Sequence, residues 1–169
     1  AAKGEILQAT GAFTPPAATY PNGTHVVEVE VDPQTGRIEV LRYVAIDDFG
    51  DVVNPLLLAG QVHGGIVQGL GQASVERTVY DRDNGQLLTA SFLDYAMPRA
   101  DDTSAIHFET LNVKTTTNAL GIKGAGEAGT VGATPAVANA VIDAIRRHNG
   151  LRHLDTPFTP EKVWAAING

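Results

Sequence analysis

The segment Gly124-Ala-Gly-Glu-Ala-Gly129 carries a single carboxylate, Glu127, among small residues. Its spacing matches the G-x-G-x-x-G pattern of dinucleotide-binding loops, whose glycines let a pyrophosphate approach a helix N-terminus. A carboxylate in such a loop would repel phosphate groups. Because its neighbours are small, Glu127 is instead suited to act as a general base, which must come within hydrogen-bond distance of the proton it takes. The alternative is a solvent-exposed glutamate without a role.

The surrounding sequence does not predict the context of a dinucleotide loop. In those folds a strand runs into the first glycine, a helix opens at the last ones, and an acid ends a second strand ~20 residues later. Here the nearest strand ends near Val113, the helix signal begins at Thr134-Pro135, and the position of the acid falls in the helical segment 142–148. A Walker A loop is also excluded, because no Gly-Lys-Ser or Gly-Lys-Thr occurs.

A second glycine cluster lies in the segment 54–76, whose apolar periodicity is helical and which opens with Asn54-Pro55. Each glycine inside a helix costs about 1 kcal/mol relative to alanine. The cluster therefore indicates that another backbone or a ligand approaches closely, and both alternatives stay open. Its members are Gly60, Gly64, Gly65, Gly69 and Gly71. Gln61, between them, offers both amide donors and an acceptor to a ligand.

The elements that must position these residues predict an α+β fold with mixed, mostly antiparallel sheets. Alternating apolar and polar residues predict a hairpin over 25–47, a second hairpin over 77–92 and a strand over 105–113. Thr134 and Pro135 predict the start of a helix that ends at Gly150, and Thr159-Pro160 predicts a short C-terminal helix.

Composition excludes several classes of function. The 169 residues carry a net charge of −7 and no cysteine, which argues against a nucleic-acid surface and against thiolate metal sites. The five histidines show no metal-ligand spacing. Without a run of ~18 apolar residues we expect no membrane span. The opening "AAKGEILQ" has neither an initiator Met nor a signal-peptide pattern, so we expect a piece of a longer polypeptide.

Four stretches occur in an order that resembles a known family: "NPLLLAGQVHGGIVQGLGQA", "LDYAMPRADD", "TNALGIKGAGEAGTVGATPAVANAVIDAI" and "TPEKVW". They are similar to the C-terminal part of the molybdenum-binding large subunit of molybdenum hydroxylases. That superfamily comprises xanthine dehydrogenases, aldehyde oxidoreductases and aerobic carbon monoxide dehydrogenases, and the resemblance is closest to large chains of the carbon monoxide dehydrogenase type. It implies that residues 1–169 form a C-terminal molybdopterin-binding domain or subdomain of a longer large subunit.

The resemblance implies a cytoplasmic oxidoreductase that hydroxylates or oxidises a small substrate (carbon monoxide, an aldehyde or an N-heterocycle) with water-derived oxygen. The implied cofactor is molybdenum-molybdopterin, expected in its cytosine dinucleotide form. The implied partners are the rest of the large subunit and separate Fe–S and flavin (FAD) subunits. By itself the chain is expected to be inactive and to lack cofactor, because the family's substrate-side loops lie in the earlier part of the large subunit. The residues alone do not identify the substrate.

The same resemblance implies roles for individual residues. Glu127 matches the family glutamate that acts as base at the molybdenum centre, and no protein side chain is expected to ligate the metal. The residues implied in cofactor binding are Gln61, Gly64, Gly65, Asp48, Asn54, Lys123, Gly124 and Gly126. Phe49 departs from the family pattern, in which relatives often have cysteine, so local contacts with the cofactor are expected to differ. Two alternatives remain: a dinucleotide-binding domain that uses the GAGEAG loop, and a non-catalytic interaction module.

Overall fold

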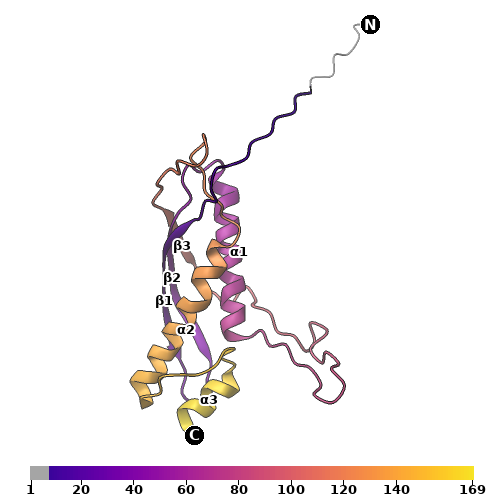
Figure 1. Ribbon diagram of the computed structural model, residues 1–169. Coiled ribbons are helices and arrows are strands. Elements are labelled where there is room, and N and C mark those ends of the chain that lie inside the picture. The colour runs from indigo at the N-terminus through magenta and orange to yellow at the C-terminus, as the bar shows by residue number, and fades with distance from the viewer. Residues whose placement is uncertain (1–7) are drawn as a thin grey trace.

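The computed structural model describes residues 8–169 and shows an α+β fold in which two long helices lie to one side of a three-stranded sheet (Figure 1). Strand β1 (Asn22–Val31) pairs antiparallel with β2 (Ile38–Asp48), and β2 pairs in parallel with β3 (Ile106–Thr110). The sheet order is β1-β2-β3. The predicted hairpin over 25–47 is confirmed, and the sheet is mixed, with one pairing of each kind.

Helix α1 (Pro55–Ser74) begins where the sequence predicts it. The Asn54 side chain accepts a hydrogen bond from the Leu57 amide at 3.1 Å, and Pro55 occupies the first turn, where its missing N–H costs nothing. Since α1 connects the parallel strands β2 and β3, these three elements form a β-α-β crossover.

Helix α2 (Ala128–Asn149) starts earlier than predicted, because Thr134 and Pro135 lie inside it instead of opening it. The predicted end is confirmed, since Gly150 adopts a left-handed conformation with φ of 86°. By length and composition, α2 could cross a membrane, but core helices of folded domains pass the same test. Its buried residues pack into the core of this domain, so we describe it as a core helix.

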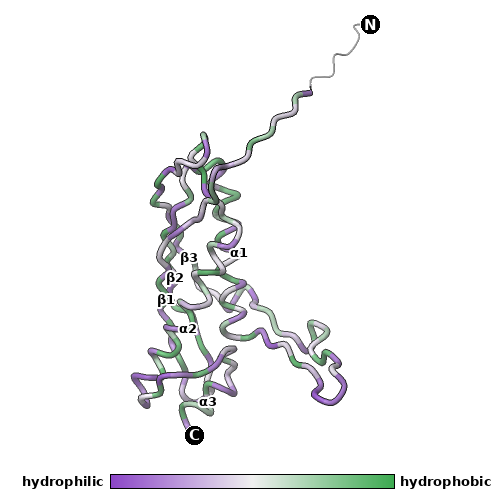
Figure 2. Tube along the Cα trace, in the orientation of Figure 1, coloured by the Kyte–Doolittle hydropathy of each residue, from purple (hydrophilic) through white to green (hydrophobic). Residues whose placement is uncertain are grey.

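The predicted second hairpin over 77–92 is confirmed only around its turn, where the Asp81 amide donates to the Gln86 carbonyl and the Leu88 amide donates to the Val79 carbonyl, each at 2.8 Å. Residues 77–104 as a whole form an arm that leaves the end of α1 and projects away from the helices (Figure 1). Its antiparallel pairing is limited to one isolated bridge, between Tyr80 and Leu87, and its most hydrophilic residues lie at the tip (Figure 2). A two-stranded ribbon without a packing partner is only marginally stable, which explains why the alternating pattern did not form full strands.

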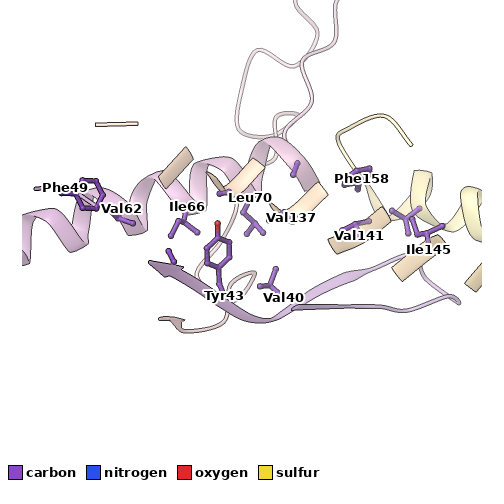
Figure 3. Packing of buried hydrophobic residues seen from close by; sticks show 14 residues of the cluster. Val40, Tyr43, Phe49, Val62, Ile66, Leu70, Val137, Val141, Ile145 and Phe158 are labelled. Atoms are coloured by element: carbon purple, nitrogen blue, oxygen red, sulfur yellow. The ribbon is translucent and has the colours of Figure 1, made fainter. Parts of the chain in front are cut away.

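The hydrophobic core lies between the sheet and the two long helices (Figure 3). Tyr43 of β2 and Ile66 of α1 are 2% and 1% exposed. From α2, every fourth residue along one face is buried: Val137, Val141 and Ile145. Helix α3 (Pro160–Asn168) adds Val163 to the same core, and the preceding Phe158 joins it, with its amide donating to the Ala73 carbonyl at 2.7 Å. This core fixes α2, and so the loop that precedes it.

Candidate functional site

Glu127 occupies the N-cap position of α2. Its carbonyl accepts the Val131 amide at 3.0 Å, whereas its side chain makes no capping hydrogen bond and is exposed. A helix therefore does open directly after this loop, so the predicted helix start at Thr134 was wrong. No described strand runs into the first glycine, as predicted, because β3 ends at Thr110, well before Gly124. The carboxylate thus lies at the positive end of a long helix with its oxygens available to a ligand.

Gln61 of α1 lies beside the same loop. Its side-chain amide donates a hydrogen bond to the Gly126 carbonyl at 2.8 Å, although 65 positions separate the two residues. That bond uses one of the two N–H donors and leaves the other donor and the amide oxygen available to a ligand. The structure therefore brings together the two glycine-rich segments that the sequence singled out, with Gln61 joining them next to Glu127.

The glycines of these two segments fall into two groups. A Cβ atom added at Gly65 would lie 3.0 Å from the Thr130 amide, and one at Gly129 would lie 2.4 Å from the Val62 carbonyl. These glycines, with Gly69, let α1 and α2 pack backbone to backbone. In contrast, a Cβ atom would meet nothing within 4 Å at the open glycines Gly60, Gly64, Gly124 and Gly126. Gly64 therefore faces free space, whereas Gly65 is explained by helix packing; a cofactor contact at either stays a prediction.

Asp48 and Lys123 form a nearly buried ion pair. The Lys123 ammonium lies 2.5 Å from the Asp48 carboxylate, and the side chains are 12% and 9% exposed. The same carboxylate accepts the amides of Gly50 and Val113, each at 2.9 Å. Burial by itself would raise the pKa of Asp48, but the hydrogen bond from Lys123 and those from the two amides lower it to about 2. The pair ties the end of β2 to the segment that leads into the glycine loop.

Two further predicted positions have structural roles in the described chain. Asn54 caps α1, as noted above, and its predicted contact with a cofactor stays untested. Phe49 is 2% exposed and packs edge-on against Phe108 with ring centroids 6.2 Å apart. A side chain of this size at position 49 is therefore accommodated as part of the core.

A cavity of about 700 Å³ lies beside Glu127, between the start of β1 and the first turns of α2. Its wall includes Gly124, Gly126 and Glu127, and also His25 and Asp47 of the β1–β2 hairpin. Neither His25 nor Asp47 was singled out from the sequence, where a lone histidine in an alternating strand carries no functional signal. No lysine or arginine lines this cavity, and residues 8–169 contain no group of three or more His, Asp or Glu side chains able to hold a metal ion.

The sequence matches a known domain family, described as the molybdopterin cofactor-binding domain, over residues 1–104. It is 37% identical to the nicotine 6-hydroxylase large subunit of Paenarthrobacter nicotinovorans, over 96% of this chain and 20% of that protein. It is also 37% identical to the carbon monoxide dehydrogenase large chain of Hydrogenophaga pseudoflava, over 95% of this chain and 20% of that protein. The chain therefore spans about a fifth of the length of the curated relatives it matches.

Solved structures of oxidoreductases are also similar to this chain. A Cu,Mo-CO dehydrogenase in its carbon monoxide reduced state superposes with a TM-score of 0.85 and 33% sequence identity, over 91% of this chain and 19% of that one. Quinoline 2-oxidoreductase from Pseudomonas putida 86 superposes with a TM-score of 0.80 and 36% identity, over 87% of this chain and 18% of that one. These alignments extend over most of the chain, beyond the segment 1–104 that the domain family matches.

Proposed function

This chain belongs to the molybdopterin cofactor-binding domain family, and from this premise we propose that it forms part of a molybdenum-dependent oxidoreductase in which Glu127 is the general base. The observation that carries the proposal is the position of Glu127, at the start of α2, beside Gln61 and on the wall of a 700 Å³ cavity. Relatives named as a nicotine hydroxylase and as carbon monoxide dehydrogenases support an oxidoreductase.

The residues around Glu127 fit a pterin cofactor. The open glycines leave the backbone uncovered on both α1 and the loop, so a flat ligand can approach it closely. Within the described part of the chain, the amides of Gly124 and Gly126 donate to no protein acceptor. Together with the free oxygen of Gln61, they offer the donors and acceptor that a pterin or an oxo group requires. When bound, the cofactor supplies the redox chemistry.

The residues of this chain position the base, Glu127, and orient the bound ligand relative to it. Glu127 holds its carboxylate in open space, where it can take a proton from a water-derived nucleophile within hydrogen-bond distance. Gln61 and the loop amides fix the ligand relative to that carboxylate. Asp48 and Lys123 neutralise each other, so they stabilise the loop and present no net charge to the ligand. Gly64, Gly65 and Asn54 complete the proposed cofactor-binding set.

The proposal extends to the whole enzyme. It includes the cytosine dinucleotide form of the cofactor, separate Fe–S and flavin subunits, a small substrate and a cytoplasmic location, all supported by the resemblance to large subunits of this superfamily. It also assigns residues 1–169 to the C-terminal part of the large subunit, supported by the resemblance of the four ordered sequence stretches to that part of the superfamily. Since the other parts of the site would come from the rest of that subunit, the isolated chain is expected to be inactive.

The test is Glu127→Gln in the complete enzyme, assayed with carbon monoxide, an aldehyde and an N-heterocycle as trial substrates. Glutamine keeps the size of the side chain but cannot take a proton, so turnover should fall by about 10²–10⁴-fold, the usual contribution of a general base. Molybdenum content, measured by mass spectrometry, should not change. Glu109→Gln, on an exposed part of β3, is the matched control. Near-normal rates in Glu127→Gln would refute the assignment.

A further inference from the structure

Three buried polar side chains, His25, Tyr43 and Asp47, form a hydrogen-bonded chain beside the cavity that Glu127 lines. His25 Nδ1 lies 2.7 Å from the Tyr43 hydroxyl, and its Nε2 lies 3.3 Å from one oxygen of Asp47 and 3.4 Å from the other. The His25 and Asp47 side chains are only 5% and 4% exposed, and Tyr43 is 2% exposed. His25 of β1 pairs with Ala45 of β2, and Tyr43 and Asp47 lie two positions to either side of Ala45, so the hairpin register brings the three side chains together on one face of the sheet.

With Asp47 as a carboxylate and His25 as a neutral ring, one arrangement of protons satisfies all three groups. A carboxylate only accepts hydrogen bonds, so Nε2 of His25 carries a proton and donates it to Asp47. Burial, and to a lesser extent the charge of Asp47, raise the pKa of Tyr43, so its hydroxyl stays protonated and donates to Nδ1 of the neutral ring. Both ring nitrogens are then satisfied, and the imidazole has a fixed orientation.

The fixed ring packs directly against α2. A Cβ atom added at Gly132 would lie 2.5 Å from His25 Nδ1 and 2.6 Å from Cε1, so only glycine admits the ring at this distance. A Cβ atom added at Gly23 of β1 would lie 1.9 Å from a carboxylate oxygen of Asp47, so the strand also packs closely against the hydrogen-bond partner of His25. The imidazole is therefore a rigid spacer between the hairpin and the beginning of α2.

The His25 imidazole contacts α2 near its N-terminus, where Glu127 is the N-cap residue. Gly132 follows Glu127 by little more than one helical turn, and the backbone between them is continuous α-helix from Ala128 onward. His25 and Glu127 line the same cavity. Among the described residues that line this cavity, the carboxylates are Asp47 and Glu127.

We propose that His25 is a positioning residue for Glu127: held by Tyr43 and Asp47, it fixes the first turns of α2 and so the place of the carboxylate in the cavity. This inference rests on the proposed function of Glu127 as the base. It assigns His25 no contact with the cofactor and no proton transfer. Its effect is exerted through the helix.

The first test measures His25→Ala in two backgrounds of the complete enzyme. In the wild type, kcat should fall roughly 10- to 100-fold, since a displacement of about 1 Å costs that much, while KM and molybdenum content stay within about twofold. In Glu127→Asp, whose shorter side chain already displaces the carboxylate, the same change should lower kcat by less than about threefold. His153→Ala, which removes an exposed histidine that also pairs with an aspartate, is the control and should change neither background.

The second test is independent of turnover. Gly132→Ala should lower the melting temperature of the enzyme by about 2–8 °C, because the methyl group overlaps the imidazole. In the His25→Ala background the ring is gone, so the same Gly132→Ala should lower the melting temperature by less than half as much. An equal loss in both backgrounds would show that His25 does not pack on α2 as proposed.

The outcomes separate the two proposals. If Glu127→Gln keeps normal rates, the proposed function fails whatever His25 does. If Glu127→Gln is inactive but His25→Ala lowers kcat by the same factor in the wild type and in Glu127→Asp, His25 does not act through Glu127 and the inference is overturned. An unchanged kcat in His25→Ala overturns it as well.

Discussion

The side-chain amide of Gln61 donates a hydrogen bond to the backbone carbonyl of Gly126 at 2.8 Å. The bond joins α1 to the loop that holds Glu127, and both partners lie at the surface of the domain. It therefore connects two segments distant in sequence at the point where the proposed site needs a fixed geometry.

Replacing Gln61 should weaken the site and leave the fold intact. A single hydrogen bond contributes about 1 kcal/mol, so Gln61→Ala should lower kcat of the complete enzyme roughly fivefold or more, together with its molybdenum content. Gln68→Ala is the control, because Gln68 also joins α1 to a distant segment, by accepting a hydrogen bond from Thr130 of α2 at 3.2 Å, but lies two turns further along α1. Equal effects of the two substitutions on molybdenum content would contradict a specific role for Gln61.

The packed glycines and the open glycines should respond oppositely to alanine. Gly129→Ala places a methyl group 2.4 Å from the Val62 carbonyl, and overpacking of this kind destabilises by about 1–3 kcal/mol. Gly60→Ala places it in open space within α1, where the higher helix propensity of alanine should stabilise by about 0.5–1 kcal/mol. Denaturant unfolding of the purified protein measures both; a stabilised Gly129→Ala variant would be inconsistent with close helix packing.

The Asp48–Lys123 ion pair should make stability depend on pH in a defined window. The folded-state pKa of Asp48 is about 2, below its ordinary value of 3.8. The stabilisation, on the order of 2 kcal/mol, is therefore fully present above pH 3.8 and is lost as the pH falls through about 2. Unfolding measured between these pH values should show a steeper loss of stability for the wild type than for Asp48→Asn.

Removal of the cation gives a second measurement on the same pair. Lys123→Met leaves a nearly buried carboxylate with its two amide donors but no counter-charge, which should cost about 3 kcal/mol at neutral pH. Lys114→Met is the matched control, since it breaks a 2.7 Å ion pair with Asp51 whose side chains are 72% and 46% exposed. An exposed pair contributes at most about 1 kcal/mol. Equal losses for both variants would show that burial does not strengthen the Asp48–Lys123 pair.

Local sequence determined a large part of this fold. The alternation of side chains predicted the β1–β2 hairpin, and Asn54-Pro55 predicted the start of α1, because caps and strand periodicity depend only on neighbouring residues. The chemistry of a carboxylate among glycines also singled out Glu127 without any structure.

Tertiary contacts decided the rest. The first turns of α2 contain Gly129, Thr130, Val131 and Gly132, which are poor helix formers, and Pro135 lies inside the helix. The predicted start at Thr134 was wrong because packing of Gly129 and Ala133 against α1 stabilises turns that their own propensity does not. Likewise, the sequence could not tell which glycines of α1 face α2 and which face open space, since that depends on how the two helices are rotated against each other. His25 and Asp47 gave no signal because their partnership exists only when strand pairing joins residues 22 positions apart.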